Sequence, residues 1–306
     1  MTDTKMNRRT ALGVGMAGLA TVAAPAKTSA AMPPSMTSAG LPDLEDPITR
    51  AWVRAKVAGS IAEEEVYSFY RLHLYSYLHE GNAEPMFTMN NLNITKWRPL
   101  DDGTYAATIF ESGAYCKFNT DEALDYWENP MTGEKREVWP FVGGPIQSQV
   151  GPDGSVTDET ATVKPKAHPL EIFGDTIFVA NGSSFSFPNP LDPDKWPNES
   201  SSRIYHWDSH SVRAAKLDDV LNPAYTSAPG FAQFQNLVDF HPWVGMGKFP
   251  GRSYGKAYGT KLKSLDDLPG PARKTLEKQT PEIFNIDSWT GPRLDFPEYM
   301  ADRKPT

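Results

Sequence analysis

The segment YSFYRLHLYSYLH, residues 67–79, decides how the rest of the chain is interpreted, because its aromatic and titratable residues alternate. Successive side chains of a β-strand point to opposite faces. The odd-numbered face would carry Tyr67, Phe69, Arg71, His73, Tyr75, Tyr77 and His79, and the even-numbered face Val66, Ser68, Tyr70, Leu72, Leu74, Ser76 and Leu78. Aromatic rings interleaved with titratable groups favour a cavity lining on the odd-numbered face. The alternative is the solvent-facing surface of an open sheet, where aromatic residues form cross-strand pairs.

Similar alternation recurs along the chain, and turn-forming residues separate several of the alternating segments. These segments are residues 61–79, 84–98, 104–118, 136–142, 170–187, 203–213, 231–244 and 252–262. This pattern favours a mainly β fold, which is either a single antiparallel β-barrel or a strongly bent sheet of about eight strands.

Two segments depart from this pattern and are predicted to be helical. Asp46 to Val57 begins with a capping residue, and Pro47 suits the first helical position. Leu265 to Phe284 contains helix-forming residues, with Pro281 as a stop or kink. We therefore expect a short N-terminal helix and a C-terminal helix packed outside the sheet.

The N-terminus has the features of a twin-arginine export signal, which predicts a periplasmic location for the mature protein. Arg8 and Arg9 precede the weakly apolar run Ala11–Ala24, and small residues suited to cleavage follow. That run is shorter than the roughly 20 residues needed to cross a bilayer. We assign residues 1–31 to the signal, 32–45 to a flexible leader and 46–306 to one β-barrel-like domain.

The charge of the chain argues against nucleic acid and anionic lipid as partners. The 306 residues carry a formal net charge of −8, and signal removal would take away more basic than acidic residues. Nucleic acid and anionic membranes are bound through basic patches, so we expect a hydrophobic or aromatic small molecule as the partner, and no membrane contact after signal cleavage. Cys116 is the one cysteine, so no internal disulfide can form. The sequence leaves the oligomeric state open.

Glu111 is the candidate for acid/base chemistry, because it is the one carboxylate on a mostly apolar strand face. That face also carries Tyr105, Ala107, Ile109, Gly113 and Tyr115. A carboxylate in such surroundings is either paired or has a raised pKa. A pair with Arg71 would make it a structural anchor, whereas a contact with His73 or a ligand hydroxyl would make it a general base.

His206, Asp208 and His210 share one face of the segment RIYHWDSHSVR, residues 203–213. Three such residues suggest a metal site, but positions two apart on a strand are spread over roughly 7 Å, so one strand seldom supplies all three ligands. A hydrogen-bonded pocket wall and a solvated strand face remain the alternatives.

The predicted site draws on several segments. Its catalytic residues are Glu111, His73, Arg71 and Tyr115. Its substrate-binding residues are Tyr67, Phe69, Tyr75, Tyr105, His206, Asp208, His210 and Trp243. The turn at residues 129–134 needs only a structural explanation, because its proline and glycine suit a hairpin loop.

Several motifs resemble the bacterial family catalogued as domain of unknown function 1838. They are a Glu followed four residues later by a Tyr (Glu111 and Tyr115), the run from Trp127 through Asn129-Pro130-Met131-Thr132-Gly133-Glu134, the Tyr70-Arg71 pair, the segment Asn189 to Trp196, and Pro242-Trp243-Val244 with Met246-Gly247. The resemblance covers nearly all of the mature chain. It implies an exported protein but no activity, and the chain departs from it at Gly143-Gly144-Pro145, where a polar Asn-rich turn is expected.

No nucleophile elbow, phosphate-binding loop, paired-cysteine zinc motif or dinucleotide fingerprint occurs in the sequence. We therefore expect chemistry that needs only placed acids and bases and no cofactor: a lyase or isomerase acting on a hydroxylated aromatic or terpenoid. A non-catalytic periplasmic carrier of hydrophobic molecules is the alternative. A third hypothesis is an interaction protein, which a surface patch of the odd-numbered aromatic residues would favour.

Overall fold

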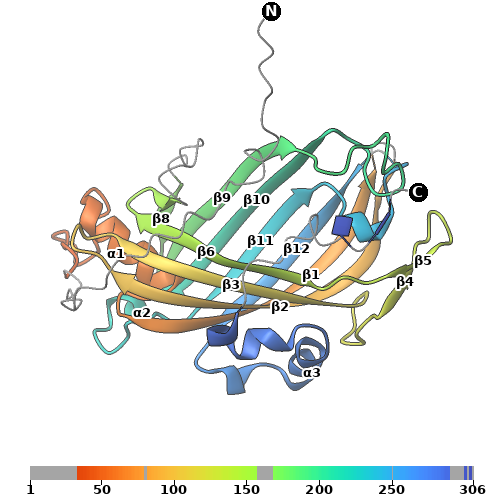
Figure 1. The fold of residues 1–306 in the computed structure, drawn as a ribbon. Coiled ribbons are helices and arrows are strands. Elements are labelled where there is room, and N and C mark those ends of the chain that lie inside the picture. The colour runs from red at the N-terminus through yellow and green to blue at the C-terminus, as the bar shows by residue number, and fades with distance from the viewer. Residues whose placement is uncertain are drawn as a thin grey trace, which may run out of the picture.

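Ten strands form one antiparallel sheet in the part of the chain that the computed structural model describes, which is residues 33–78, 81–156, 168–249, 251–289, 300–301 and 303–304. Their order across the sheet is β7-β6-β3-β2-β1-β12-β11-β10-β9-β8. The bounds are β1 Glu64–Leu78, β2 Ala83–Pro99, β3 Tyr105–Lys117, β6 Phe141–Gly151, β7 Gly154–Val156, β8 Leu170–Phe173, β9 Thr176–Pro188, β10 Ile204–Lys216, β11 Gly230–Val238 and β12 Gly251–Leu262. The sheet curls into a half-barrel (Figure 1).

The mainly β, strongly curled sheet confirms the predicted fold class, although the strand number exceeds eight. One difference comes from a turn inside a predicted segment, and another from the segment 136–142, which covers only parts of β5 (Lys135–Glu137) and β6 (Phe141–Gly151). A turn at Gly174, which has φ 60°, divides residues 170–187 into β8 and β9. A hairpin of β4 (Tyr126–Glu128) and β5 (Lys135–Glu137) lies outside the main sheet. Strands of three residues are too short to show alternation, which explains why β4 and β7 were missed.

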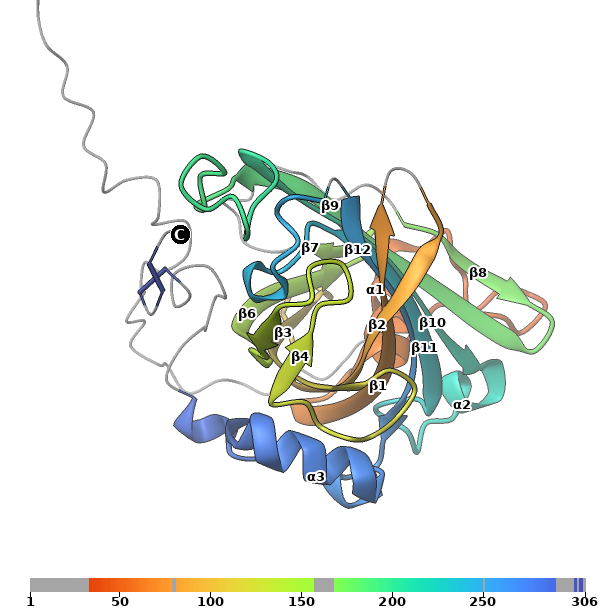
Figure 2. The same cartoon turned by 90° about the vertical axis from the view of Figure 1, so that its right-hand side faces the viewer.

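Helix α1 (Pro47–Ala58) lies inside one end of the curl (Figure 2). The Asp46 carboxylate accepts hydrogen bonds from the backbone N–H groups of Ile48 and Thr49, as the predicted cap requires. Two opposite faces of α1 are buried, each against a different part of the structure. Ala51 and Ala55 pack toward β1, β2, β3 and β6, while Trp52, Val53 and Val57 pack toward β9, β10 and the short helix α2 (Leu217–Leu221).

Arg54 of α1 bridges the seam where the two edges of the sheet approach each other. Its Nε donates to the carbonyl oxygen of Pro152, between β6 and β7, at 2.7 Å. Its Nη1 donates to Ala180 O in β9 at 3.2 Å, and its Nη2 donates to His168 O just before β8. The side chain is almost fully buried. One guanidinium thus joins both edges of the half-barrel to the helix inside it.

The other end of the curl is filled by what we call the aromatic cap: Phe87, Tyr115, Trp127 and Trp243, whose rings pack on one another. Trp243 belongs to the 3-10 helix η1 (Pro242–Val244), and Trp127 to the β4–β5 hairpin. Asn129, which is fully buried in the loop of that hairpin, donates its side-chain amide to Val244 O at 3.0 Å and Gly245 O at 3.3 Å. The turn at residues 129–134 is therefore structural, as predicted.

Helix α3 (Gly270–Gln279) covers the outer face of β2 and β3, with the 3-10 turns η2 (Leu265–Asp267), η3 (Pro281–Phe284) and η4 (Ile286–Ser288) around it (Figure 1). Leu276 and Ile283 pack there against Leu92 and Ile94. This arrangement confirms a C-terminal helix packed outside the sheet.

In the described part of the chain, no helix is both long and apolar enough to span a bilayer. Residues 1–31, predicted to be the export signal, and His79 lie outside the described residues. Their predicted roles therefore stay predictions.

Replacing Arg54 should destabilise the protein strongly. Arg54→Met leaves three carbonyl acceptors without their donor, which should lower the free energy of unfolding by about 3–5 kcal/mol. Arg50→Met is the matched control, because Arg50 makes an ion pair with the exposed carboxylate of Asp153 and should cost less than about 1 kcal/mol. Urea unfolding followed by Trp fluorescence measures both. Equal losses in the two variants would contradict the role of Arg54 at the seam.

Candidate functional site

Two adjoining chambers lie inside the curl, between α1 and the aromatic cap. The larger, of about 200 Å³, is the apolar chamber, and its walls include Leu72, Leu74, Met89, Phe141, Trp207 and Phe234. The smaller, of about 110 Å³, is the polar chamber next to α1, and its walls include Arg54, Thr95, Trp97, Ser148, Ser155 and Asn181. Four residues border both chambers, and we call them the central quartet: Tyr70, Asn93, Glu111 and Arg213.

Strand register explains why the central quartet meets. Asn93 of β2 lies opposite Glu111 of β3, and the Asn93 Nδ2 donates to Glu111 Oε1 at 3.0 Å. Tyr70 lies on the inner face of β1. Arg213 extends from β10, and its Nη2 donates to Tyr70 Oη at 3.4 Å, a long hydrogen bond. Side chains from four strands thus converge between the chambers.

Glu111 combines burial with a free oxygen. Burial raises the pKa of its carboxyl group, while the positive charge of Arg213 and the hydrogen bond from Asn93 act in the opposite direction. Among the described residues, Asn93 is its one hydrogen-bond partner, so the second carboxyl oxygen remains available. A carboxyl group of this kind, at a cavity wall, is suited to proton transfer.

The segment Gly143-Gly144-Pro145, where the sequence analysis expected a polar turn, lies beside Glu111. Gly143 pairs with Glu111 across β3 and β6, and the register shifts next to this pair. Gly144 has φ 99°, and a Cβ on it would lie 2.3 Å from Ile109 O. Glycine at this position lets β6 pass close to β3. The path of β6 beside Glu111 therefore depends on Gly144.

The odd-numbered face of β1 points away from both chambers and does not line them. The even-numbered residues Tyr70, Leu72 and Leu74 border the apolar chamber instead. Both faces of this strand carry aromatic residues, and the face richer in leucine is the one that packs inward. On the outer face, His73 packs against Phe118 and Tyr258.

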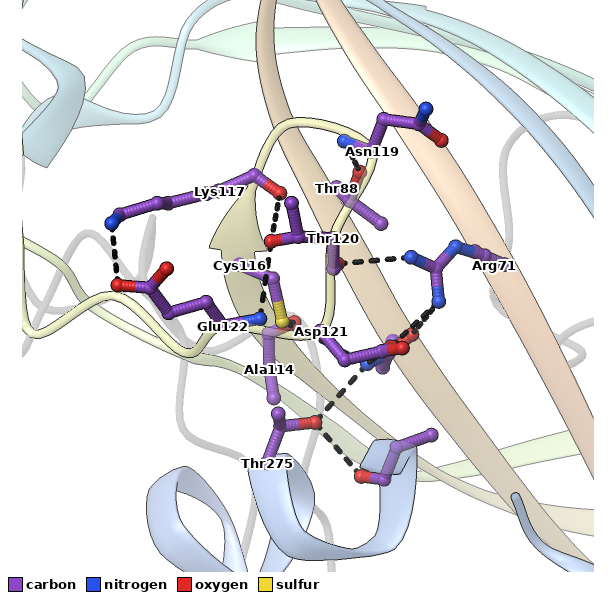
Figure 3. Close-up of polar contacts among 12 residues, drawn as sticks. Arg71, Thr88, Ala114, Cys116, Lys117, Asn119, Thr120, Asp121, Glu122 and Thr275 are labelled. Carbon is purple, nitrogen blue, oxygen red and sulfur yellow. Dashed lines mark hydrogen bonds and ion pairs between the residues drawn. The ribbon is translucent and has the colours of Figure 1, made fainter. Parts of the chain in front are cut away.

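Arg71 is held in a polar network on the outer face and does not pair with Glu111. Its Nη1 donates to Asp121 Oδ1 at 2.6 Å, and its Nη2 donates to Thr120 O at 2.9 Å (Figure 3). Asn90 extends the network to Asp121 and to Thr275 of α3. Arg71 therefore anchors the loop after β3 beneath α3, at a distance from the central quartet.

The aromatic residues predicted for substrate binding on β1 also lie outside. Tyr67 and Phe69 pack against the apolar cluster beneath α3, and Tyr75 packs edge-on against Phe118. Phe69 and Arg71 border an open groove of about 500 Å³ on the outer face. This outer groove is the surface feature that the interaction-protein hypothesis would require.

His206, Asp208 and His210 share a strand face as predicted, and in the described chain no three His, Cys, Asp or Glu side chains are placed to hold a metal ion. His206 Nδ1 lies 3.2 Å from Asp239 Oδ2, and Asp239 also binds Arg252. His210 borders the apolar chamber, whereas His206 and Asp208 do not line either chamber.

The remaining predicted residues lie on the inner face at its two ends. Tyr115 borders the apolar chamber and packs in the aromatic cap with Trp243. Tyr105 is buried against the cluster around α1, and burial raises its pKa to about 12. Tyr105 and Trp243 therefore support the ends of the cavity without bordering it.

Sequence reasoning missed Tyr70, Asn93 and Arg213. A signal existed for Arg213, because it shares the odd-numbered face of residues 203–213 with Trp207, Ser209 and Ser211. Sequence reasoning instead chose the opposite face, because that face carries two histidines.

The outer network around Arg71 can be tested through Cys116, the one cysteine of the chain. Cys116 is buried beside this network, and Asn90 Nδ2 lies 3.7 Å from its sulfur. Asp121→Asn removes the carboxylate and should lower the free energy of unfolding by about 1–2 kcal/mol, exposing the thiol more often. Glu122→Gln, at an exposed pair with Lys117, is the control. The rate of thiol labelling should rise only in Asp121→Asn, and equal rates would contradict the anchoring role.

The raised pKa of Glu111 should be visible in the pH dependence of stability. Above pH 4.5, the ordinary value, the unfolded chain loses this proton while the folded chain keeps it. Raising the pH through the interval between the two values therefore favours the unfolded state. The free energy of unfolding of the wild type should fall relative to that of Glu111→Gln over this interval. Urea unfolding at successive pH values measures the difference, and a constant difference would contradict a raised pKa.

Comparison with known proteins gives a family for this chain. No curated protein matches it. One family model does match, over residues 63–290, and its description is "Protein of unknown function (DUF1838)". The matched span contains the whole central quartet and the motifs in which the resemblance was recognised. Because the match covers most of the sequence, the chain belongs to the DUF1838 family.

Proposed function

We propose that the protein is a cofactor-independent lyase or isomerase that uses acid/base chemistry on a hydroxylated aromatic or terpenoid molecule bound in the two chambers. The observation that carries this proposal is the placement of Glu111. Glu111 is half-buried, its carboxyl group has a raised pKa, and among the described residues one carboxyl oxygen has no hydrogen-bond partner beside the cavity. A buried carboxyl group is costly for folding, so its presence at a cavity wall favours a chemical role.

Each member of the central quartet has a role in this proposal. Glu111 removes a proton from the substrate or returns it, and the hydrogen bond from Asn93 fixes the orientation of its carboxyl group. Arg213 and the Tyr70 hydroxyl group stabilise negative charge that develops on a substrate oxygen. In this proposal Arg213 is the catalytic arginine, in place of Arg71, which the sequence analysis had counted among the catalytic residues.

The apolar chamber supports the choice of substrate class. Its walls combine aliphatic side chains with the rings of Phe141, Trp207 and Phe234, which suit an aromatic or terpenoid skeleton. The polar chamber offers Thr95, Ser148 and Asn181 to hydroxyl groups. A twin-arginine signal at residues 1–31 would place this reaction in the periplasm.

A non-catalytic carrier is the second candidate, and the apolar walls favour it. Such walls hold a hydrophobic molecule without any chemistry, and enclosure between α1 and the aromatic cap would shield the molecule from water. The two functions differ in what Glu111 contributes, because a carrier needs it only for binding.

Glu111→Gln should separate enzyme from carrier. The wild type and the variant are incubated with a panel of hydroxylated aromatic dimers and terpenoids. Binding is followed by Trp fluorescence, for which Trp207 and Trp97 border the chambers, and product by mass. An enzyme should lose about 100-fold or more in turnover, since general acid/base catalysis contributes roughly 10²–10⁴-fold, with affinity little changed.

Glu122→Gln is the control, because the same change is made in an exposed carboxylate outside the cavity. Binding without conversion by the wild type would favour the carrier. Conversion that Glu111→Gln leaves unchanged would exclude Glu111 as the acid/base residue.

A further inference from the structure

Arg213 is a cation without an anionic partner in the interior of the half-barrel. Within the described part of the chain, its one hydrogen bond is the long contact to Tyr70 Oη at 3.4 Å. Among the described residues, no carboxylate oxygen lies within 4.0 Å of its guanidinium group. The side chain is half-buried and borders both chambers. A guanidinium group has five N–H donors, and the described residues accept one hydrogen bond from this one.

The charges around Arg213 are mostly positive, although the whole chain is acidic. Arg54 borders the polar chamber too, but its donors are taken by three carbonyl groups. Lys261 donates to Lys56 O, Gly59 O and Ser227 Oγ, each at 2.9 Å. The pKa of Lys261 is lowered to about 7, first by burial and next by the positive charge of Arg213. The negative charge of Glu64 acts in the opposite direction on Lys261. Arg213 itself would attract an anion bound at this end of the interior.

Glu111 does not neutralise Arg213 directly. The two side chains border the same chambers and influence each other electrostatically, yet they form no ion pair within 4.0 Å. Each also keeps hydrogen-bonding capacity on the side of the cavity. A planar ligand group with two oxygens suits the guanidinium fork of Arg213, because the fork can donate two parallel hydrogen bonds to it.

We propose that the molecule bound in the chambers carries a carboxylate group, held by the guanidinium fork of Arg213 at the central quartet, with its apolar part in the apolar chamber. This inference rests on the proposed function for the position of the ligand. It narrows the proposed substrates to those that carry a carboxylate group. The apolar part contacts Leu72, Leu74 and Phe234, while the carboxylate lies at the central quartet. Arg213 is then the specificity-determining residue, and it acts by charge and by its planar fork.

Three unreactive probes with one skeleton test this inference: 3-phenylpropanoate, 3-phenylpropanamide and 3-phenylpropanol. Their binding to the wild type is measured by isothermal titration calorimetry at pH 7. The carboxylate should bind about 10- to 100-fold more tightly than the alcohol and the amide, which is the preference expected of a charge-assisted contact. This comparison uses only the wild-type protein, so it does not depend on the folding of any variant.

Arg213→Gln should remove that preference. The carboxylate should lose about 10- to 100-fold in affinity, while the alcohol changes less than about 3-fold. Arg213→Lys keeps the charge without the fork and should lose less than Arg213→Gln. Arg203→Gln is the matched control, because Arg203 lies just before β10 and pairs with exposed carboxylates outside the cavity. Urea unfolding confirms that each variant is folded.

Equal affinities of the three probes for the wild type would overturn the inference, and so would equal weakening of all three by Arg213→Gln. Failure of every probe to bind at about 1 mM would overturn it as well. The outcome is independent of the proposed catalysis, since none of these probes needs to react. A carboxylate preference without turnover of any panel compound would support the inference and leave the enzyme proposal unsupported. Turnover of neutral substrates without a carboxylate preference would support the enzyme proposal and overturn the inference.

Discussion

The hydrogen bonds of Arg54 are the constraint on which the half-barrel depends. In the described residues, β7 and β8 at the two edges of the sheet are not paired with each other, so other contacts must hold the edges β6–β7 and β8–β9 together. Arg54 does this from inside, by donating to the carbonyl oxygens of Pro152, His168 and Ala180. Asn181 adds a side-chain contact across the seam to Ser155 at 3.2 Å. A buried guanidinium group with its donors satisfied stabilises this arrangement, whereas the same group without acceptors would be very costly.

The position of α1 also creates the two-chamber cavity. A helix inside one end of the curl and an aromatic cap in the other leave the middle of the barrel unfilled, and Tyr70, Asn93, Glu111 and Arg213 meet there. The same helix brings Arg54 and Lys56 into the interior, close to Lys261 and Arg213. The end of the cavity next to α1 therefore holds several cationic side chains. Glu111 lies between this end and the apolar chamber. Helix α1 therefore both bounds the cavity and supplies part of its positive charge.

The sequence predicted the elements well and the orientation of strand faces poorly. The helix expected at Asp46–Val57 is α1 at Pro47–Ala58, because capping residues act locally and can be recognised without the fold. Alternation correctly grouped Glu111 with Tyr105 and Tyr115, but it does not say which face of a strand turns inward. In β1 both faces carry aromatic rings, and in β10 the histidines concealed the inward face that holds Arg213. That choice depends on the curvature of the sheet and on what packs inside it, and neither is a local property.

The family motifs and the central quartet differ in what explains them. Asn129 and Trp243 have sufficient reasons in packing, since one holds the β4–β5 hairpin to η1 and the other fills the aromatic cap. Glu111 has no such reason, because its burial opposes folding and one hydrogen bond from Asn93 does not offset the loss of water around a carboxylate. Arg213 is similar, since a cation with one long hydrogen bond adds little to the stability of the barrel. Residues that the fold does not need, and that meet at a cavity, are the ones whose presence is best explained by a ligand.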